Sequence, residues 1–75
     1  MSPPRKRSLT LAGHRTSVSL EDEFWRAFRE LAAERSVSPA ELATEIDRAR
    51  GLETGLATAI RLYVLERYRE QLGLA

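Results

Sequence analysis

The sequence predicts a mainly α-helical fold in which a short strand region precedes three helices. Two runs near the N-terminus alternate polar and apolar residues, whereas the rest of the chain carries apolar residues at helical spacing. The chain has 75 residues and no cysteine, so it holds one domain at most and has no disulfides. A core of this size is marginal, and self-association is the stabilising device that remains.

The strand region consists of two alternating runs, residues 8–11 and 15–20, separated by residues 12–14. Alternate side chains of the second run point to opposite faces. One face carries Thr16, Val18 and Leu20, and the other carries Arg15, Ser17 and Ser19. Because a strand this short is unstable alone, it needs a partner. That partner is either the first run of the same chain or the second run of another copy, paired antiparallel about a two-fold axis.

The first helix is expected to begin near residue 20 or 21 and to end before residues 35–39. Its apolar stripe includes Phe24, Phe28 and Leu31, which follow one another at helical spacing. Acidic residues at 21–23 favour the start of a helix because they complement its dipole.

A capping box, Ser38-Pro39-Ala40-Glu41, marks the start of the second helix. This helix is expected to end near Gly51, and a third helix is expected from residues 54–56 to about residue 72. The third helix has a broad apolar side, which predicts burial on more than one side and favours a partner chain.

Basic residues gather near the N-terminus. Residues 1–20 contain Arg5, Lys6, Arg7 and Arg15 and no acidic residue, although the formal charge of the whole chain is only +1. This asymmetry is typical of a basic segment that meets a polyanion. We interpret residues 1–7 as a basic flexible arm; a solvated tail is the alternative.

Composition also argues against several functions. No apolar run reaches the roughly 18 residues that span a bilayer, so no membrane is expected. The single histidine and the absence of phosphate-binding glycine motifs predict no metal, no cofactor, no catalytic residue and no enzyme activity. The thiol-free composition suits the cytoplasm.

The run from Arg15 to Asp22, followed by a helix and then by residues 36–42, resembles the ribbon-helix-helix DNA-binding family, which includes the Arc and methionine repressors. Residues 6–21 and 59–66 look like a stand-alone bacterial subfamily, and the resemblance covers residues 6–70. It implies a ribbon-helix-helix fold with an additional C-terminal helix, in which the N-terminal strand pairs antiparallel in an intertwined homodimer. The domain is expected over residues 8–72, and residues 73–75 form a tail.

The resemblance implies a role for each group of residues. The outward strand residues, expected to read bases in the major groove, are Arg15, Ser17 and Ser19. The residues expected to contact phosphates are Arg5, Lys6, Arg7, His14, Ser38 and Ala40. The expected dimer core comprises Thr16, Val18, Leu20, Phe24, Phe28, Leu42, Ile46, Ile60 and Val64. Arginine and serine suit the first role because arginine pairs with guanine and serine serves either base type.

Three residues depart from the family pattern. Family members often have glycine before the second helix, where this chain has Ser36. Pro39 has no N–H group, and Glu41 would lie near a bound phosphate. Both features weaken the phosphate site implied at this helix.

We therefore predict a sequence-specific regulator of transcription, a repressor or autoregulator, that binds double-stranded DNA as a homodimer on the cytoplasmic nucleoid. The alternative is a helical protein-interaction module, or an antitoxin, whose C-terminal helix binds an unknown partner protein.

Overall fold

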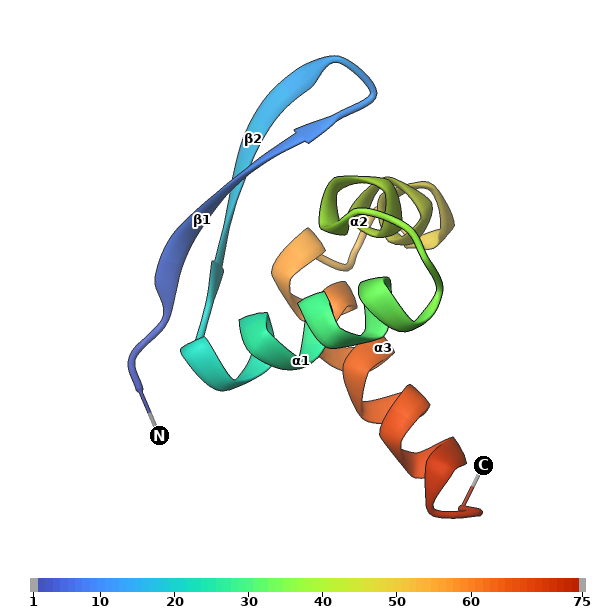
Figure 1. Cartoon of the computed structure of the whole chain (residues 1–75). Helices are drawn as coiled ribbons and strands as arrows, with labels where there is room; N and C mark the ends of the chain where they lie inside the picture. The colour runs from blue at the N-terminus through green and yellow to red at the C-terminus, as the bar shows by residue number, and fades with distance from the viewer. Residues whose placement is uncertain (1, 75) are drawn as a thin grey trace.

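The computed structural model describes residues 2–74, which form an antiparallel hairpin followed by three helices. The elements are β1 (Arg5–Leu11), β2 (His14–Leu20), α1 (Asp22–Glu34), α2 (Pro39–Ala49) and α3 (Leu56–Gln71). Figure 1 shows the helices on one side of the hairpin, with the end of α3 extending away from the other elements. Met1 and Ala75, which end the expected arm and tail, lie outside the described residues.

The two strands of the hairpin belong to one chain. They pair in register from Leu11 opposite His14 to Arg5 opposite Leu20. Only Ala12 and Gly13 separate them, with φ angles of 49° and 85°. Positive φ at both central residues is the requirement of a type I′ turn, whose twist matches that of the strands it joins. The first of the two expected pairings, within one chain, is therefore the one observed.

The basic segment expected as a flexible arm is partly a strand. Arg5, Lys6 and Arg7 are the first three residues of β1 and extend the alternation that was expected to begin at Ser8. The extension has a physical cause, because these residues continue the ladder opposite residues 18–20 of β2. The expected arm is thus wrong for residues 5–7.

The hydrophobic core lies between the inner face of the hairpin and the helices. Each strand contributes alternate residues: Leu9 and Leu11 from β1, and Val18 and Leu20 from β2. The buried residues from the helices are Phe28, Leu31, Ala32, Leu42, Ala43, Ile46, Ile60 and Val64.

The residues expected to form a dimer core thus lie in the core of one chain. Seven of the nine are buried there, whereas Thr16 and Phe24 are half-buried. Their burial needs no second copy, because β1 and the three helices of the same chain cover them.

The helix boundaries follow local signals in the sequence. Ser38 Oγ accepts a hydrogen bond from the Glu41 N–H at 3.0 Å, and the Glu41 carboxylate accepts one from the Ser38 N–H at 3.3 Å, so the expected capping box is present. The turn before it places Ser36 in the left-handed region, with φ of 59°. There the Val37 N–H donates to the Ala32 carbonyl at 3.0 Å, which closes α1 with a Schellman arrangement.

Helix α3 is covered by the rest of the chain on one side only. Ile60 and Val64 are buried, whereas Leu62 and Leu65 remain 49% and 53% exposed. The broad apolar side expected from the sequence is therefore split between core and surface. Within residues 2–74, no helix combines the length and the apolar character that a bilayer crossing requires.

Candidate nucleic-acid interface

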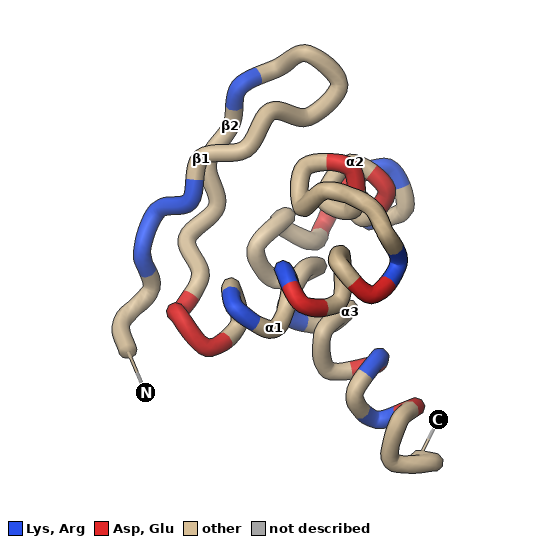
Figure 2. Tube along the Cα trace, viewed as in Figure 1, with Lys and Arg blue, Asp and Glu red and all other residues tan. Residues whose placement is uncertain are grey.

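The outer face of the hairpin is a row of polar side chains from both strands. The cross-strand pairs are Lys6 opposite Ser19, Ser8 opposite Ser17, and Thr10 opposite Arg15. All six residues are exposed, and the name outer face refers to these six alone. On the hairpin itself, Figure 2 shows basic positions and no acidic ones. The acidic positions begin at the junction of β2 with α1.

The orientation predicted for β2 is confirmed. Val18 and Leu20 are buried and Thr16 is half-buried, whereas Arg15, Ser17 and Ser19 are exposed on the opposite face. Sequence reasoning missed Ser8 and Thr10, which lie on the same outer face. The alternation at residues 8–11 carries the signal for them, because the first of the two expected pairings, between the two runs of one chain, places Ser8 and Thr10 on this face.

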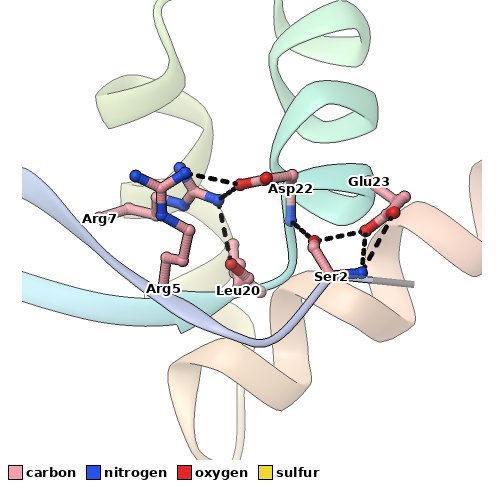
Figure 3. Close-up of polar contacts among 6 residues, drawn as sticks. All are labelled: Ser2, Arg5, Arg7, Leu20, Asp22 and Glu23. Carbon is pink, nitrogen blue, oxygen red and sulfur yellow. Dashed lines mark hydrogen bonds and ion pairs between the residues drawn. The ribbon is translucent and has the colours of Figure 1, made fainter.

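Arg7 takes a structural position instead of the expected position at a phosphate. It lies on the inner side of β1, where its side chain is only 15% exposed. Its guanidinium forms an ion pair with Asp22 and donates to the Leu20 carbonyl at 3.2 Å (Figure 3). The guanidinium carbon also lies 5.7 Å from the centroid of the Trp25 ring. The phosphate contact expected of Arg7 is therefore not favoured by its position, because the period of a strand turns its side chain toward the helices.

The Arg7–Asp22 pair joins the hairpin to the first turn of α1. The hydrogen bond from Arg7 lowers the pKa of the Asp22 carboxyl below its ordinary value of 3.8. Arg5 adds a weaker contact at 3.6 Å and keeps 65% of its side chain exposed. Of these two arginines, Arg5 is therefore the one that remains accessible to a ligand.

Ser2 caps α1 from outside the helix. Its Oγ accepts a hydrogen bond from the Asp22 N–H at 2.9 Å and donates one to Glu23 Oε1 at 2.8 Å (Figure 3). A hydrogen bond from its own backbone, followed by that from Ser2, lowers the pKa of Glu23. The N-cap residue of α1, Glu21, makes no side-chain cap of its own.

Arg61 of α3 holds the end of β2 from the other side. It donates to Glu21 Oε1 at 3.0 Å and to the Ser19 carbonyl at 3.0 Å, and it lies over the Phe24 ring at 5.9 Å. The backbone N–H of Glu21 and then Arg61 lower the pKa of the Glu21 carboxyl. Sequence reasoning missed this contact, because Arg61 lies forty residues from Glu21 and carries no local signal.

The first turn of α2 offers little to a phosphate. The capping box uses the N–H groups of Ser38 and Glu41, and Pro39 has none. Ala40 supplies the remaining N–H of this turn, and it lines a hollow of about 400 Å³ together with Thr10 of the hairpin. His14 is exposed at the start of β2, on the same side as Thr16.

No group of three or more histidine, aspartate or glutamate residues in the described part of the chain could hold a metal ion. The polar groups that form the candidate ligand site are those of the hairpin and its junction with α1. Their chemistry is that of hydrogen bonding and positive charge.

Comparison with known proteins identifies the family. A family model described as a ribbon-helix-helix domain matches residues 4–68, which include both strands, α1, α2 and most of α3. No curated protein and no solved structure matches the chain in these comparisons. Members of this family are typically DNA-binding regulators of transcription or antitoxins that bind DNA as dimers, and the fold is not typically enzymatic. Because the match covers most of the sequence and the strands and helices follow in the expected order, the chain belongs to the ribbon-helix-helix family.

Proposed function

We propose that this protein is a sequence-specific DNA-binding repressor or autoregulator of transcription that inserts its ribbon into the major groove. The observation that carries the proposal is the outer face, where two cations and four hydroxyl side chains are exposed on a two-stranded ribbon. B-DNA admits such a ribbon in its major groove, where base edges present a distinct pattern for each base pair. The site of action would be the nucleoid, in the cytoplasm.

Arg15 is the side chain best suited to reading a base. It is exposed on the outer face, and a guanidinium can bond both O6 and N7 of guanine. Ser17 and Ser19 follow on the same face, each able to donate to or accept from a base edge. The proposed base contacts on β2 are therefore Arg15, Ser17 and Ser19.

Phosphate contacts would fix the ribbon in the groove without reading sequence. The exposed candidates near the hairpin are Arg5, Lys6 and His14, and the half-buried Ala40 offers its backbone N–H. Ser38 is a weaker candidate because its Oγ is engaged in the capping box. If Arg5 and Lys6 of two copies each met a phosphate, log K against log salt would have a slope of about −4 from these contacts.

The central test removes Arg15. Arg15→Ala should reduce the ratio of operator to random-DNA affinity by about 5- to 150-fold, because a good bidentate pair discriminates by roughly 1–3 kcal/mol. Arg26→Ala is the matched control, since it removes an exposed arginine from α1 rather than from the ribbon. An equal loss of operator and random affinity in Arg15→Ala would mean that this residue does not read bases.

Two further measurements complete the test. Thr16→Ala should lower the melting temperature without changing the preferred sequence, because Thr16 lies on the inner side. A reporter gene with the operator across its promoter should be silenced by the native protein and released by Arg15→Ala. An active reporter with the native protein bound would contradict a repressor.

We also propose that the protein acts as a homodimer, joined through an apolar stripe on α3. The stripe consists of Leu62 and Leu65 of α3 and of Leu72 at the C-cap of the helix, three and seven residues apart, and they are 49%, 53% and 74% exposed. A second copy is the occupant that fits best, because members of the family typically bind DNA as dimers. Each chain would then bring its own hairpin to the DNA.

Sedimentation equilibrium tests the dimer. Leu65→Glu should shift the protein from dimer to folded monomer, because it places a charge in the proposed interface. Leu52→Glu is the control, since Leu52 is fully exposed outside the stripe. A native protein that sediments as a monomer at micromolar concentration would refute the dimer.

The same stripe favours the second candidate function, a protein-interaction module or antitoxin whose α3 binds another protein. The two functions differ in their response to salt. A DNA-binding protein loses affinity for random duplex DNA steeply as salt rises. An interaction module would show no salt-dependent binding to DNA at all.

A further inference from the structure

The two strands of the hairpin repeat one another in sequence. Residues 6–11 read Lys-Arg-Ser-Leu-Thr-Leu, and residues 15–20 read Arg-Thr-Ser-Val-Ser-Leu. Position by position, each strand has a cation, a polar residue, a serine, an aliphatic residue, a second hydroxyl residue and a leucine. The repeat is offset by nine residues, so that position 6 corresponds to position 15.

The register of the hairpin converts this repeat into a local two-fold symmetry. Ser8 lies opposite Ser17, so the two equivalent serines form the central pair. Lys6 lies opposite Ser19, and Thr10 lies opposite Arg15. A two-fold axis through the central pair therefore exchanges Lys6 with Arg15. The same axis exchanges Thr10 with Ser19. A register shifted by one residue would have destroyed this match.

The inner positions of the repeat are explained by packing. Leu9 and its counterpart Val18 are buried, as are Leu11 and its counterpart Leu20. The outer positions have no such explanation. Among the described residues, none of the six outer-face side chains makes a hydrogen bond or an ion pair within the chain, whereas the inward Arg7 makes both.

We propose that the hairpin of a single chain is a complete reading surface, and that Lys6, Ser8 and Thr10 of β1 contact bases alongside the residues of β2. This inference rests on the proposed DNA-binding function and extends it. The ligand that fits the surface is duplex DNA with a short inverted repeat, because a two-fold surface presents the same groups to both DNA strands. Lys6 and Arg15 would each meet a guanine, one on each strand.

The geometry sets the spacing of those guanines. Lys6 and Arg15 lie at diagonal corners of the outer face, four residues apart in register. At about 3.3 Å per residue, this separation is roughly 13 Å along the ribbon. The same length corresponds to about four base-pair rises of B-DNA. The preferred site should therefore contain two guanines on opposite strands separated by about four base pairs.

Selection from a random duplex library tests both the site and the role of Lys6. The native protein should enrich an inverted repeat with guanines at that spacing. Lys6→Ala should lower the ratio of selected-site to random-DNA affinity by roughly 5-fold or more. Arg5→Ala is the matched control: it removes the neighbouring exposed cation, whose side chain alternates away from the outer face. Arg5→Ala should leave the ratio of selected-site to random-DNA affinity unchanged, because a phosphate contact carries no sequence information.

The outcomes separate this inference from the proposed function. If Arg15→Ala abolishes the preference while Lys6→Ala behaves like Arg5→Ala, then β1 contacts only phosphates and the inference is overturned alone. An enriched site without inverted symmetry would also overturn it. If no sequence is enriched, both the inference and the proposed function fail.

A cross-link shows whether one chain supplies both strands when bound to DNA. The chain has no cysteine, so Ser8→Cys/Ser17→Cys places one thiol on each strand at directly opposed positions, where Cα separations of about 4.5–5.5 Å allow a disulfide. Oxidation of the DNA complex should give a product of monomer mass on a non-reducing gel. A product of dimer mass would mean that two copies share the ribbon and would overturn the inference. Ser17→Cys alone should give no dimer.

Discussion

The turn of the hairpin offers a direct test of how the ribbon is built. Ala12 has φ of 49°, in the left-handed region, and is followed by Gly13 with φ of 85°. The left-handed conformation costs most L-residues about 1–2 kcal/mol of conformational free energy. Asparagine tolerates it better, because its side chain can hydrogen-bond locally, and it is a preferred residue at the first central position of a type I′ turn. Ala12→Asn should therefore stabilise the fold.

The expected gain can be bounded from the turn. Asparagine recovers part of the left-handed penalty, about 0.5–1 kcal/mol, without adding the backbone freedom that glycine brings to the unfolded chain. Ala12→Gly should gain less for that reason. For a domain of this length, 1 kcal/mol corresponds to about 4–8 °C in melting temperature, so Ala12→Asn should raise it by about 2–8 °C.

Thermal unfolding at one fixed protein concentration measures the effect, because association would otherwise shift the midpoint. Gly13→Ala is the opposing control. A Cβ at residue 13 would meet no atom within 4 Å, so any loss of stability comes from the backbone conformation alone. If Ala12→Asn and Gly13→Ala both leave the midpoint unchanged, the two-residue turn does not form in solution and the reasoning fails.

Three further predictions concern the core and the helix termini. Asp22→Asn should lower the melting temperature more at pH 6 than at pH 2, because the pKa of Asp22 is lowered in the folded state and its contribution is lost progressively as pH falls below the ordinary value of 3.8 and through the lowered one; equal effects at both pH values would contradict the ion pair. Ser36→Gly should stabilise by up to about 1 kcal/mol in urea unfolding, because its φ of 59° suits glycine; a loss would contradict the left-handed turn. Phe28→Ala should cost about 3–5 kcal/mol in the same assay, since Phe28 is fully buried, whereas a cost below about 1 kcal/mol would place it outside the core.

Local sequence signals predicted the helices well. The capping box at Ser38 and the acidic residues at 21–23 act within a few residues, so their effect is visible in the sequence itself. Alternation likewise predicted which side chains of β2 face the core. The inward and outward residues follow from the period of a strand, which needs no knowledge of the partner.

Contacts between distant segments were beyond the reach of these signals. Period two alone could not decide whether β2 pairs with β1 or with another copy, because either partner satisfies the same hydrogen bonds. The charge of Arg7 suggested a free arm, but its position in β1 directs it to Asp22, fifteen residues away. Arg61 became relevant only when α3 packed beside the end of β2.

The short turn between β1 and β2 also has a consequence for kinetics. Strands joined by two residues find each other by intramolecular diffusion, and isolated hairpins form in roughly 1–10 μs. A ribbon assembled from two chains must instead wait for their encounter, at a rate that falls as the protein is diluted. Because β1 and β2 belong to one chain, the polar surface of the hairpin would form in a first-order step whose rate does not depend on protein concentration. Dilution would then separate the copies without dismantling the ribbon that each one carries.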